Sequence, residues 1–230
     1  MNFRGKTCLV TGAAGNLGRA VAGAFAAAGA SLILMDHQRE HLQSAYGNEG
    51  EGKRFALADL RDAQSVARAL PAGTRIDILC NIAGGFRMGQ PVHETSDDTW
   101  DLMLGLNARS VVNCARAVVP RMLAAGGGKI INVGAIAALS GKANMSAYIA
   151  SKSAVIRLTE SMAAELREKG INVNCVLPST IDTPQNRKDM PKADPKRWVA
   201  PEALADVVLF LASDAARAIH GASIPVAGLA

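Results

Sequence analysis

Tyr148 and Lys152 lie four residues apart in the segment AYIASK, and both side chains can take part in proton transfer. If this segment is helical, residues four apart share one face of the helix. A lysine ammonium beside a tyrosine phenol favours the phenolate and would lower the tyrosine pKa from about 10 toward neutral pH. The pair is therefore a candidate acid and base, although an ordinary surface pair on a helix has the same spacing.

A glycine-rich turn lies near the N-terminus, in the segment TGAAGNLG. Its first glycine permits a tight turn, the second lets a phosphate approach the backbone, and the third lets a helix pack closely on a strand. Free N–H groups at the start of the helix can then bind a pyrophosphate. The spacing G-x-x-G-x-x-G departs from G-x-G-x-x-G, and a plain strand-to-helix turn is the alternative. The candidate dinucleotide contacts are Gly12, Gly15, Asn16, Leu17 and Gly18.

Asp36 ends the second apolar run of the chain, SLILMD. A carboxylate at this point can accept hydrogen bonds from the adenosine ribose and would repel a 2′-phosphate, so we expect NAD(H) to be preferred. NADP(H) remains a possible cofactor, because His37 and Arg39 could bind its 2′-phosphate. The alternative role for Asp36 is that of a turn residue or a helix N-cap. Asp59 and Leu60 follow the third apolar run and are expected near an adenine, with a helix cap as the alternative for Asp59.

Short apolar runs alternate with longer helical segments along the chain. The expected strands are 6–11, 31–36, 54–59, 76–84, 129–135, 171–177 and 223–227. The expected helices are 17–29, 62–70, 97–127, 146–169 and 201–213, with a kink or break at Pro120. This alternation predicts a parallel sheet that is covered on both faces. We therefore expect a single α/β domain, residues 1–230, with a Rossmann-type doubly wound sheet of about seven strands.

The longest irregular stretch, residues 178–200, is rich in Pro, Asp and Lys and follows the end of an expected strand. Ligands of open α/β sheets bind at that edge, so the stretch is expected to form a lid over a site. Asn186 and Arg187 in this lid face either a ligand or solvent. Phe86 can stack on a flat ring, and packing at the rim of the core is its alternative role.

Composition excludes several classes of protein. Hydrophobic residues make up 49% of the 230 residues and charged residues 20%, which is typical of a globular chain. The net charge of +5 is scattered, which argues against a nucleic-acid partner. No segment reaches the roughly 18 apolar residues of a membrane helix, so we expect no membrane partner and a cytoplasmic location. The four cysteines form no C-x-x-C pair and the four histidines have no carboxylate at metal spacing, so no metal site is expected.

Five segments together resemble the short-chain dehydrogenase/reductase family, in order and over nearly the whole chain. They are TGAAGNLG, NIAG at 81–84, Asn107, YIASK at 148–152 and LPSTIDT at 177–183. The resemblance implies that Tyr148 donates a proton, that Lys152 tunes the phenol and holds the nicotinamide ribose, and that Asn107 links a proton relay. It also implies further cofactor contacts from Asn81, Ala83, Gly84, Pro178, Ile181 and Thr183. Finally, it implies that the helices at 97–125 and 146–169 pair between subunits in a homodimer or homotetramer acting on a small molecule.

The sequence departs from this family at one position. The family usually carries a serine thirteen residues before its tyrosine, and here that residue is Ala135, preceded by Gly134. The serine hydroxyl normally binds the carbonyl or alcohol of the substrate. Losing such a donor costs on the order of a hundredfold in rate for carbonyl chemistry. Ser140 and Ser146 are nearby, but neither holds the expected place.

Three segments are similar to the dihydropteridine reductase branch, which also lacks this serine. They are GAIAAL at 134–139, CNIAGGF at 80–86 and DTPQNRKDMPKAD at 182–194. The resemblance implies reduction by NADH of a quinonoid dihydropterin, a conjugated acceptor without an isolated carbonyl. Two alternatives stay open, a ketoreductase or alcohol dehydrogenase that works slowly without the serine, and a non-catalytic NAD(H)-binding sensor or scaffold. The intact set of Tyr148, Lys152 and Asn107 argues against the second alternative.

Overall fold

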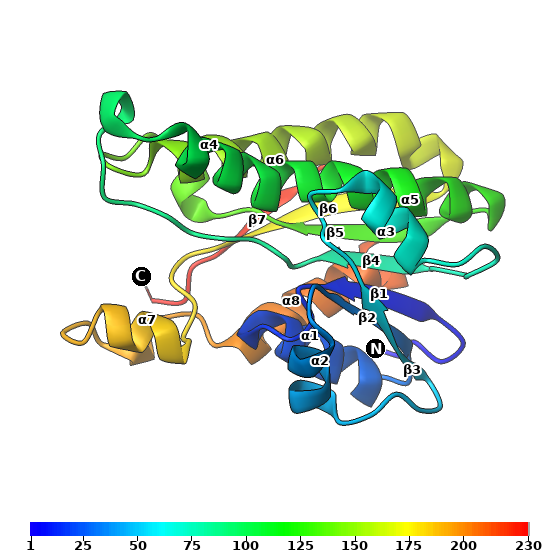
Figure 1. The fold of residues 1–230 in the computed structure, drawn as a ribbon. Coiled ribbons are helices and arrows are strands. Elements are labelled where there is room, and N and C mark those ends of the chain that lie inside the picture. Colours follow the sequence, from blue (N-terminus) through cyan, green and yellow to red (C-terminus); the bar gives the residue numbers. More distant parts are fainter. Residues whose placement is uncertain (230) are drawn as a thin grey trace.

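A single parallel sheet of seven strands forms the centre of the protein (Figure 1). The computed structural model describes residues 1–229. The strands lie in the order β3-β2-β1-β4-β5-β6-β7, and every neighbouring pair is parallel. Their bounds are β1 Thr7–Thr11, β2 Ser31–Asp36, β3 Lys53–Leu57, β4 Ile78–Asn81, β5 Gly128–Val133, β6 Ile171–Pro178 and β7 Ser223–Val226. The expected doubly wound α/β fold is confirmed.

Helices cover both faces of the sheet, with α1, α2 and α8 on one side and α3, α4, α5 and α6 on the other (Figure 1). Their bounds are α1 Asn16–Ala27, α2 Arg39–Tyr46, α3 Ala63–Ala69, α4 Asp97–Met103, α5 Ser110–Ala124, α6 Ser146–Leu166, α7 Pro184–Asp189 and α8 Pro201–Ala212. The short helix α7 stands apart from both layers (Figure 1). Within residues 1–229, none of the helices is long and apolar enough to span a bilayer.

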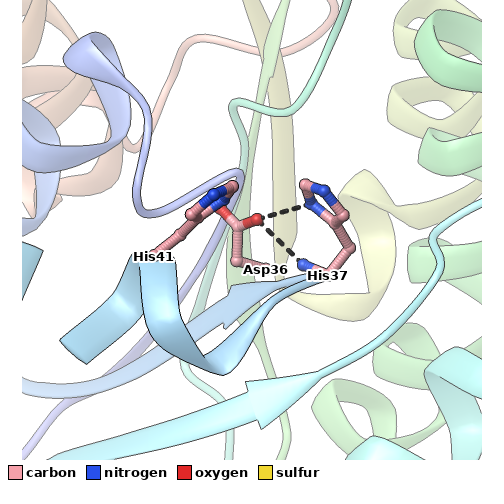
Figure 2. A group of neighbouring side chains, drawn as sticks. All are labelled: Asp36, His37 and His41. Atoms are coloured by element: carbon pink, nitrogen blue, oxygen red, sulfur yellow. Dashed lines mark hydrogen bonds and ion pairs between the residues drawn. The ribbon is translucent and has the colours of Figure 1, made fainter. Parts of the chain in front are cut away.

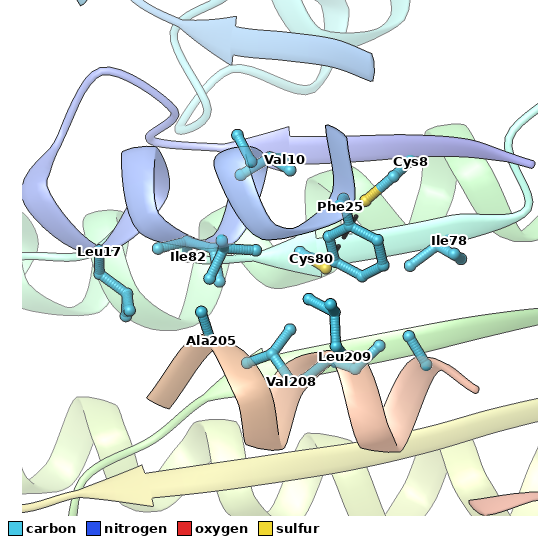
Figure 3. Packing of buried hydrophobic residues seen from close by; sticks show 14 of the residues in the cluster. Cys8, Val10, Leu17, Phe25, Ile78, Cys80, Ile82, Ala205, Val208 and Leu209 are labelled. Carbon is cyan, nitrogen blue, oxygen red and sulfur yellow. Dashed lines mark hydrogen bonds between the residues drawn. The ribbon is translucent and has the colours of Figure 1, made fainter. Parts of the chain in front are cut away.

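Burial on both faces explains why the strands are apolar throughout instead of alternating. Successive side chains of a strand point to opposite faces of the sheet. In β1, Cys8 and Val10 join the core beneath α1 and α8, where Phe25 and Val208 also lie (Figure 3). Leu9, between them, joins the core on the opposite face. Each central strand therefore needs apolar residues at every position.

The helix expected over 97–127 is interrupted, but not at Pro120. The chain forms α4, then a π-helical stretch at Leu104–Arg109, then α5. Pro120 lies inside the continuous helix α5 and is exposed, so solvent can reach the carbonyl that its ring leaves without a donor. The π-helical stretch instead contains the buried Asn107. Single π turns inside helices often occur at functional sites.

The structure differs from the prediction at three further places, all of them in short elements. Helices α2 and α7 were not predicted, because both are short and polar. The strand expected over 76–84 is confined to Ile78–Asn81, and the third strand ends at Leu57. The chain after these strands already belongs to the loops at the carboxyl edge of the sheet, where the candidate site lies.

Candidate active site

The order of the strands reverses between β1 and β4, and the loops after these two strands meet there. Gly12, directly after β1, has a φ of 61°, and a Cβ on it would lie 2.8 Å from the Cα of Ala83. Only glycine can adopt this φ and let the loops after β1 and β4 come so close without strain. A reversal of this kind opens a crevice at the carboxyl edge of the sheet, which is where ligands of such folds bind.

Helix α1 begins at this crevice with free backbone donors. Its N-cap, Gly15, provides no side-chain cap, and its first turn contains no acidic residue. A Cβ on Gly18 would collide with the carbonyl oxygen of Gly12, so the close packing expected of this glycine is present. Asn16 accepts a hydrogen bond from Arg19 at 3.0 Å, and Leu17 is buried. The start of α1 therefore suits an anionic group.

Thr11 is a residue of the site that the sequence analysis missed. Its hydroxyl oxygen accepts hydrogen bonds from the N–H groups of Ile82 at 3.1 Å and Ala83 at 3.2 Å, and donates to the carbonyl of Cys80 at 3.4 Å. The end of β1 is thereby tied to the loop after β4. A threonine directly before the first glycine of TGAAGNLG was the available signal.

Asp36 ends β2 beside the glycine turn and is held there from two sides. One carboxylate oxygen accepts the N–H of Ala14 at 3.0 Å, and the other accepts the N–H and ring Nδ1 of His37, both at 2.8 Å. The N-cap of α2 is Gln38, so Asp36 is not a helix cap. The hydroxyl of Tyr46, also unpredicted, donates to the carbonyl of Ala13 at 2.6 Å and so supports the same turn.

Asp59 and Leu60 lie beyond the end of β3. The carboxylate of Asp59 pairs with Arg61 at 2.9 Å, and this hydrogen-bonded partner lowers its pKa. The cap of α3 is Asp62, which accepts the N–H of Gln64 at 2.8 Å, so the alternative of Asp59 as the cap is wrong. The carbonyl of Leu60 accepts a hydrogen bond from Asn113 at 2.9 Å.

The sequence predicts no metal site, because no histidine has a carboxylate at metal spacing, but the structure places two histidines beside Asp36. Asp36, His37 and His41 each direct a potential ligand atom into one cluster, with all three atoms within 4.8 Å of one another (Figure 2). The cluster forms because the chain turns directly from β2 into α2. The segment DHQREH contains all three residues, but only the turn brings them together.

Lys152, on α6, is a buried cation with one hydrogen-bond acceptor. Its Nζ donates to the carbonyl of Val133 at 2.8 Å, at the end of β5. Desolvation lowers its pKa to about 8. A Cβ on Gly84 would lie 3.1 Å from this Nζ and 2.7 Å from Oδ1 of Asn107. The side chains of Lys152 and Asn107 therefore both approach Gly84, which has no side chain that would clash with them.

Asn107 is fixed in orientation by the loop after β4. Its Oδ1 accepts the N–H of Gly85 at 2.9 Å, and its Nδ2 donates to the carbonyl of Gly85 at 3.1 Å and to the hydroxyl of Ser151 at 2.9 Å. Ser151, another residue that the sequence analysis missed, donates in turn to the carbonyl of Tyr148 at 2.7 Å. The π-helical stretch is thereby linked to the turn of α6 that carries the tyrosine.

Asn81, the last residue of β4, was expected along the cofactor path, but its side chain is buried in the core. It donates to Oδ1 of Asn132 at 2.8 Å, and Asn132 donates to the hydroxyl of Thr159 at 2.8 Å. Each amide finds a partner, as buried polar groups require. This network joins β4 and β5 to α6, so it fixes the helix on which Tyr148 and Lys152 lie.

The pKa of Tyr148 moves opposite to the expectation. Burial raises it to about 12, because the phenolate would be desolvated. The ammonium of Lys152 is desolvated as well and is directed at Val133, so it does not offset the effect of burial. Phe86 packs edge-on against Tyr148, with ring centroids 4.8 Å apart, and remains 52% exposed. Phe86 therefore forms part of the rim of the site.

No serine hydroxyl is available in the segment after β5. Ala135 is 4% exposed and follows Val133, whose carbonyl is bound by Lys152. A Cβ on Gly134 would lie 2.5 Å from a methyl carbon of Leu177, so a serine there would have to displace this buried side chain. The nearby Ser140 is exposed, and the buried hydroxyl of Ser146 has no hydrogen-bond partner within residues 1–229. The position that normally holds the hydroxyl is occupied by a buried methyl group.

The side chains of the expected lid bind one another. Thr183 caps α7 by accepting the N–H of Asn186 at 3.1 Å, and Asn186 donates to the carbonyl of Ile181 at 2.8 Å. Arg187 forms two bonds to Asp182, at 2.6 and 2.7 Å. Asn186 and Arg187 therefore stabilise the lid itself, and the side chain of Arg187 also faces solvent, as one of its two expected roles had it. Pro178, the last residue of β6, places the start of the lid at the edge of the sheet.

A family profile described as short chain dehydrogenase matches residues 6–194. The chain belongs to the short-chain dehydrogenase/reductase family. It is 35% identical to a 3-oxoacyl-(acyl-carrier-protein) reductase of Thermotoga maritima, over 99% of this chain and 98% of the relative.

Two solved structures are similar over 99% of the chain. A gluconate 5-dehydrogenase of Burkholderia cenocepacia in complex with NADP and tartrate has a TM-score of 0.90 at 30% identity, with 95% of that chain covered. A 3-ketoacyl-(acyl-carrier-protein) reductase of Brucella melitensis complexed with NADH has a TM-score of 0.89 at 28% identity, with 98% covered. The protein is therefore an NAD(P)-dependent oxidoreductase for a small-molecule substrate, and the two structures together support a nicotinamide cofactor of either kind.

The buried charge of Lys152 predicts a change in stability. At pH 7 its ammonium is charged in both the folded and the unfolded chain, so the fold bears the full desolvation cost. That cost is relieved as the pH rises from about 8, the folded pKa, toward the ordinary lysine value of 10.5. Lys152→Met should therefore raise the free energy of unfolding at pH 7 by on the order of 1–3 kcal/mol, and by less at pH 10.

Urea unfolding at both pH values measures this effect, with the exposed Lys169→Met as the matched control. A Lys152→Met variant that is less stable than the control variant at pH 7 would contradict the account of a strained, buried charge.

Proposed function

We propose that the protein uses NADH to reduce a conjugated, electron-poor acceptor, in the manner of a dihydropteridine reductase. The observation that carries this proposal is the buried methyl group of Ala135 beside an otherwise assembled set of polar groups. Tyr148, Lys152 and Asn107 are connected through Ser151 and Gly84. A quinonoid dihydropterin accepts hydride without an isolated carbonyl that needs a serine donor, so the methyl group fits the acceptor.

The residues present fit a dinucleotide. The free N–H groups of α1 would bind the pyrophosphate, and Asp36 would accept hydrogen bonds from the adenosine ribose. The carboxylate of Asp36 would repel a 2′-phosphate, which favours NAD(H) over NADP(H). We place further contacts at Ala83, Gly84, Pro178, Ile181 and Thr183, with the adenine near Asp59 and Leu60. When bound, the nicotinamide supplies the hydride.

Tyr148 is the proton donor in this proposal. Its raised pKa, about 12, keeps the phenol protonated at neutral pH, so it is ready to act as an acid. Lys152, whose ammonium is held by the carbonyl of Val133, is assigned to the nicotinamide ribose. Asn107 and Ser151 act as positioning residues, because they hold the backbone carbonyl of Tyr148. The lid at 178–200 excludes water from the acceptor, and the exposed edge of Phe86 offers an apolar surface to a flat ring.

The proposed reaction predicts a strong dependence on Tyr148. Tyr148→Phe should lower kcat for freshly generated quinonoid dihydropterin by about a hundredfold or more, because it removes the acid and little volume. NADH oxidation, followed by absorbance, measures the rate, and NADH fluorescence measures binding, which should change by less than about threefold. Tight NADH binding with no turnover in either protein would instead support the non-catalytic sensor.

A second candidate function is slow reduction of ketones, because the relative from Thermotoga maritima is named as a 3-oxoacyl reductase. If ketones are the substrates, Ala135→Ser should raise kcat/KM for a β-keto ester by about a hundredfold, since it restores the missing donor. Ala137→Ser, two residues along the same segment, is the matched control. Ketone turnover that stays flat in both variants would rule out this candidate.

We also propose that the protein is a homodimer or homotetramer that pairs through its long helices. In support of this, Leu104 and Leu123, on the α4–α5 segment, are 38% and 40% exposed. Burial of such side chains between subunits would be favourable. Light scattering of the purified protein should give a mass of two or four chains, and the mass of one chain at micromolar concentration would contradict the proposal.

A further inference from the structure

Three side chains with metal-binding chemistry gather where β2 turns into α2. They are the carboxylate of Asp36 and the imidazoles of His37 and His41 (Figure 2). Nδ1 of His37 lies 2.8 Å from a carboxylate oxygen of Asp36, and the two imidazole rings are 5.6 Å apart at 79° to each other. Asp36 is buried at the base of the cluster, whereas both histidines are open to solvent. An ion can therefore reach the cluster directly.

We propose that this cluster is a binding site for a divalent transition metal ion of the zinc type, and that the ion competes with the nicotinamide cofactor. Two imidazoles and one carboxylate form a ligand set that Zn²⁺ accepts, with a fourth position open to water. Bonds of about 2.0–2.1 Å at a tetrahedral ion place ligand atoms about 3.3 Å apart. The ligand atoms here are spread over 4.8 Å at most, so rotation of the exposed imidazoles closes the site.

The surroundings of the cluster support the assignment. The second carboxylate oxygen of Asp36 accepts the N–H of Ala14 at 3.0 Å, which fixes the ligand from behind as outer partners do in metal sites. Two of the cations in this part of the chain are paired, because Arg39 binds Glu49 at 3.2 Å and Arg61 binds Asp59 at 2.9 Å, whereas Arg19 is hydrogen-bonded to the neutral Asn16. The charges of Arg39 and Arg61 are thereby partly neutralised, so these two residues oppose a bound cation less.

The competition rests on the proposed function, because Asp36 is also the residue assigned to the adenosine ribose. A carboxylate oxygen that coordinates a metal ion cannot accept hydrogen bonds from ribose hydroxyls in the same way. The ion would also stand at the place where the adenosine enters the crevice. Zn²⁺ would therefore weaken NADH binding without touching Tyr148 or Lys152, which lie on α6.

The first test is direct binding of Zn²⁺ without any cofactor. Isothermal titration of the untagged protein should show one site, and the double variant His37→Gln/His41→Gln should bind on the order of a hundredfold more weakly. His93→Gln is the matched control, because this exposed histidine lies outside the cluster. The four cysteines are buried in the folded protein and do not compete for the ion. Equal Zn²⁺ binding by the double variant would overturn the site.

The second test measures NADH binding by fluorescence at increasing Zn²⁺. The apparent Kd for NADH should rise at least about tenfold at saturating Zn²⁺ in the wild-type protein and in His93→Gln, and should not rise in the double variant. Zn²⁺ binding that leaves the Kd unchanged would overturn the competition. If the protein binds no NADH at all, the proposed function is wrong. The direct Zn²⁺ titration would still decide whether the metal site exists.

Discussion

Lys152 donates one hydrogen bond to the carbonyl of Val133, and this contact joins α6 to the end of β5. Within residues 1–229 the buried ammonium has no carboxylate partner, so the surrounding chain has to leave it both an acceptor and space. Gly84 provides the space, since any side chain there would meet both Lys152 and Asn107. The π-helical stretch brings Asn107 to this glycine, and the network through Asn132 holds α6 in place. The candidate site is thus organised around one desolvated charge.

The absence of a serine at position 135 is consistent with a site organised around Lys152. Burial raises the pKa of Tyr148 to about 12, so the phenol stays protonated at neutral pH and can supply one proton. A substrate carbonyl needs a further donor for the charge on its own oxygen, and the segment after β5 offers none. Gly134 is constrained by Leu177, and Ala135 is buried. An acceptor that spreads its charge over a conjugated ring depends less on such a donor, so the same site can serve it.

The sheet and its helical layers could be predicted, because burial on both faces and the glycine turn leave direct marks in the sequence. Their spacing placed Tyr148 and Lys152 on one helix, whereas Asn107 was implied only by the resemblance to the family. The π-helical stretch could not, since it depends on contacts between Asn107 and Gly85 that are 22 residues apart. The pKa of Tyr148 was predicted in the wrong direction, because spacing on a helix does not reveal burial. The cluster of Asp36, His37 and His41 was missed because it forms only at the turn into α2.

The most direct test of the account compares two acceptors in the unaltered protein. Single-turnover oxidation of bound NADH is measured at pH 7 with a quinonoid dihydropterin and, separately, with a β-keto ester, both at saturation. A site built around Lys152 and Tyr148 without a serine donor predicts that the dihydropterin reacts about a hundredfold faster or more. Equal rates, or a faster reaction of the keto ester, would contradict the claim that Ala135 reflects a conjugated substrate.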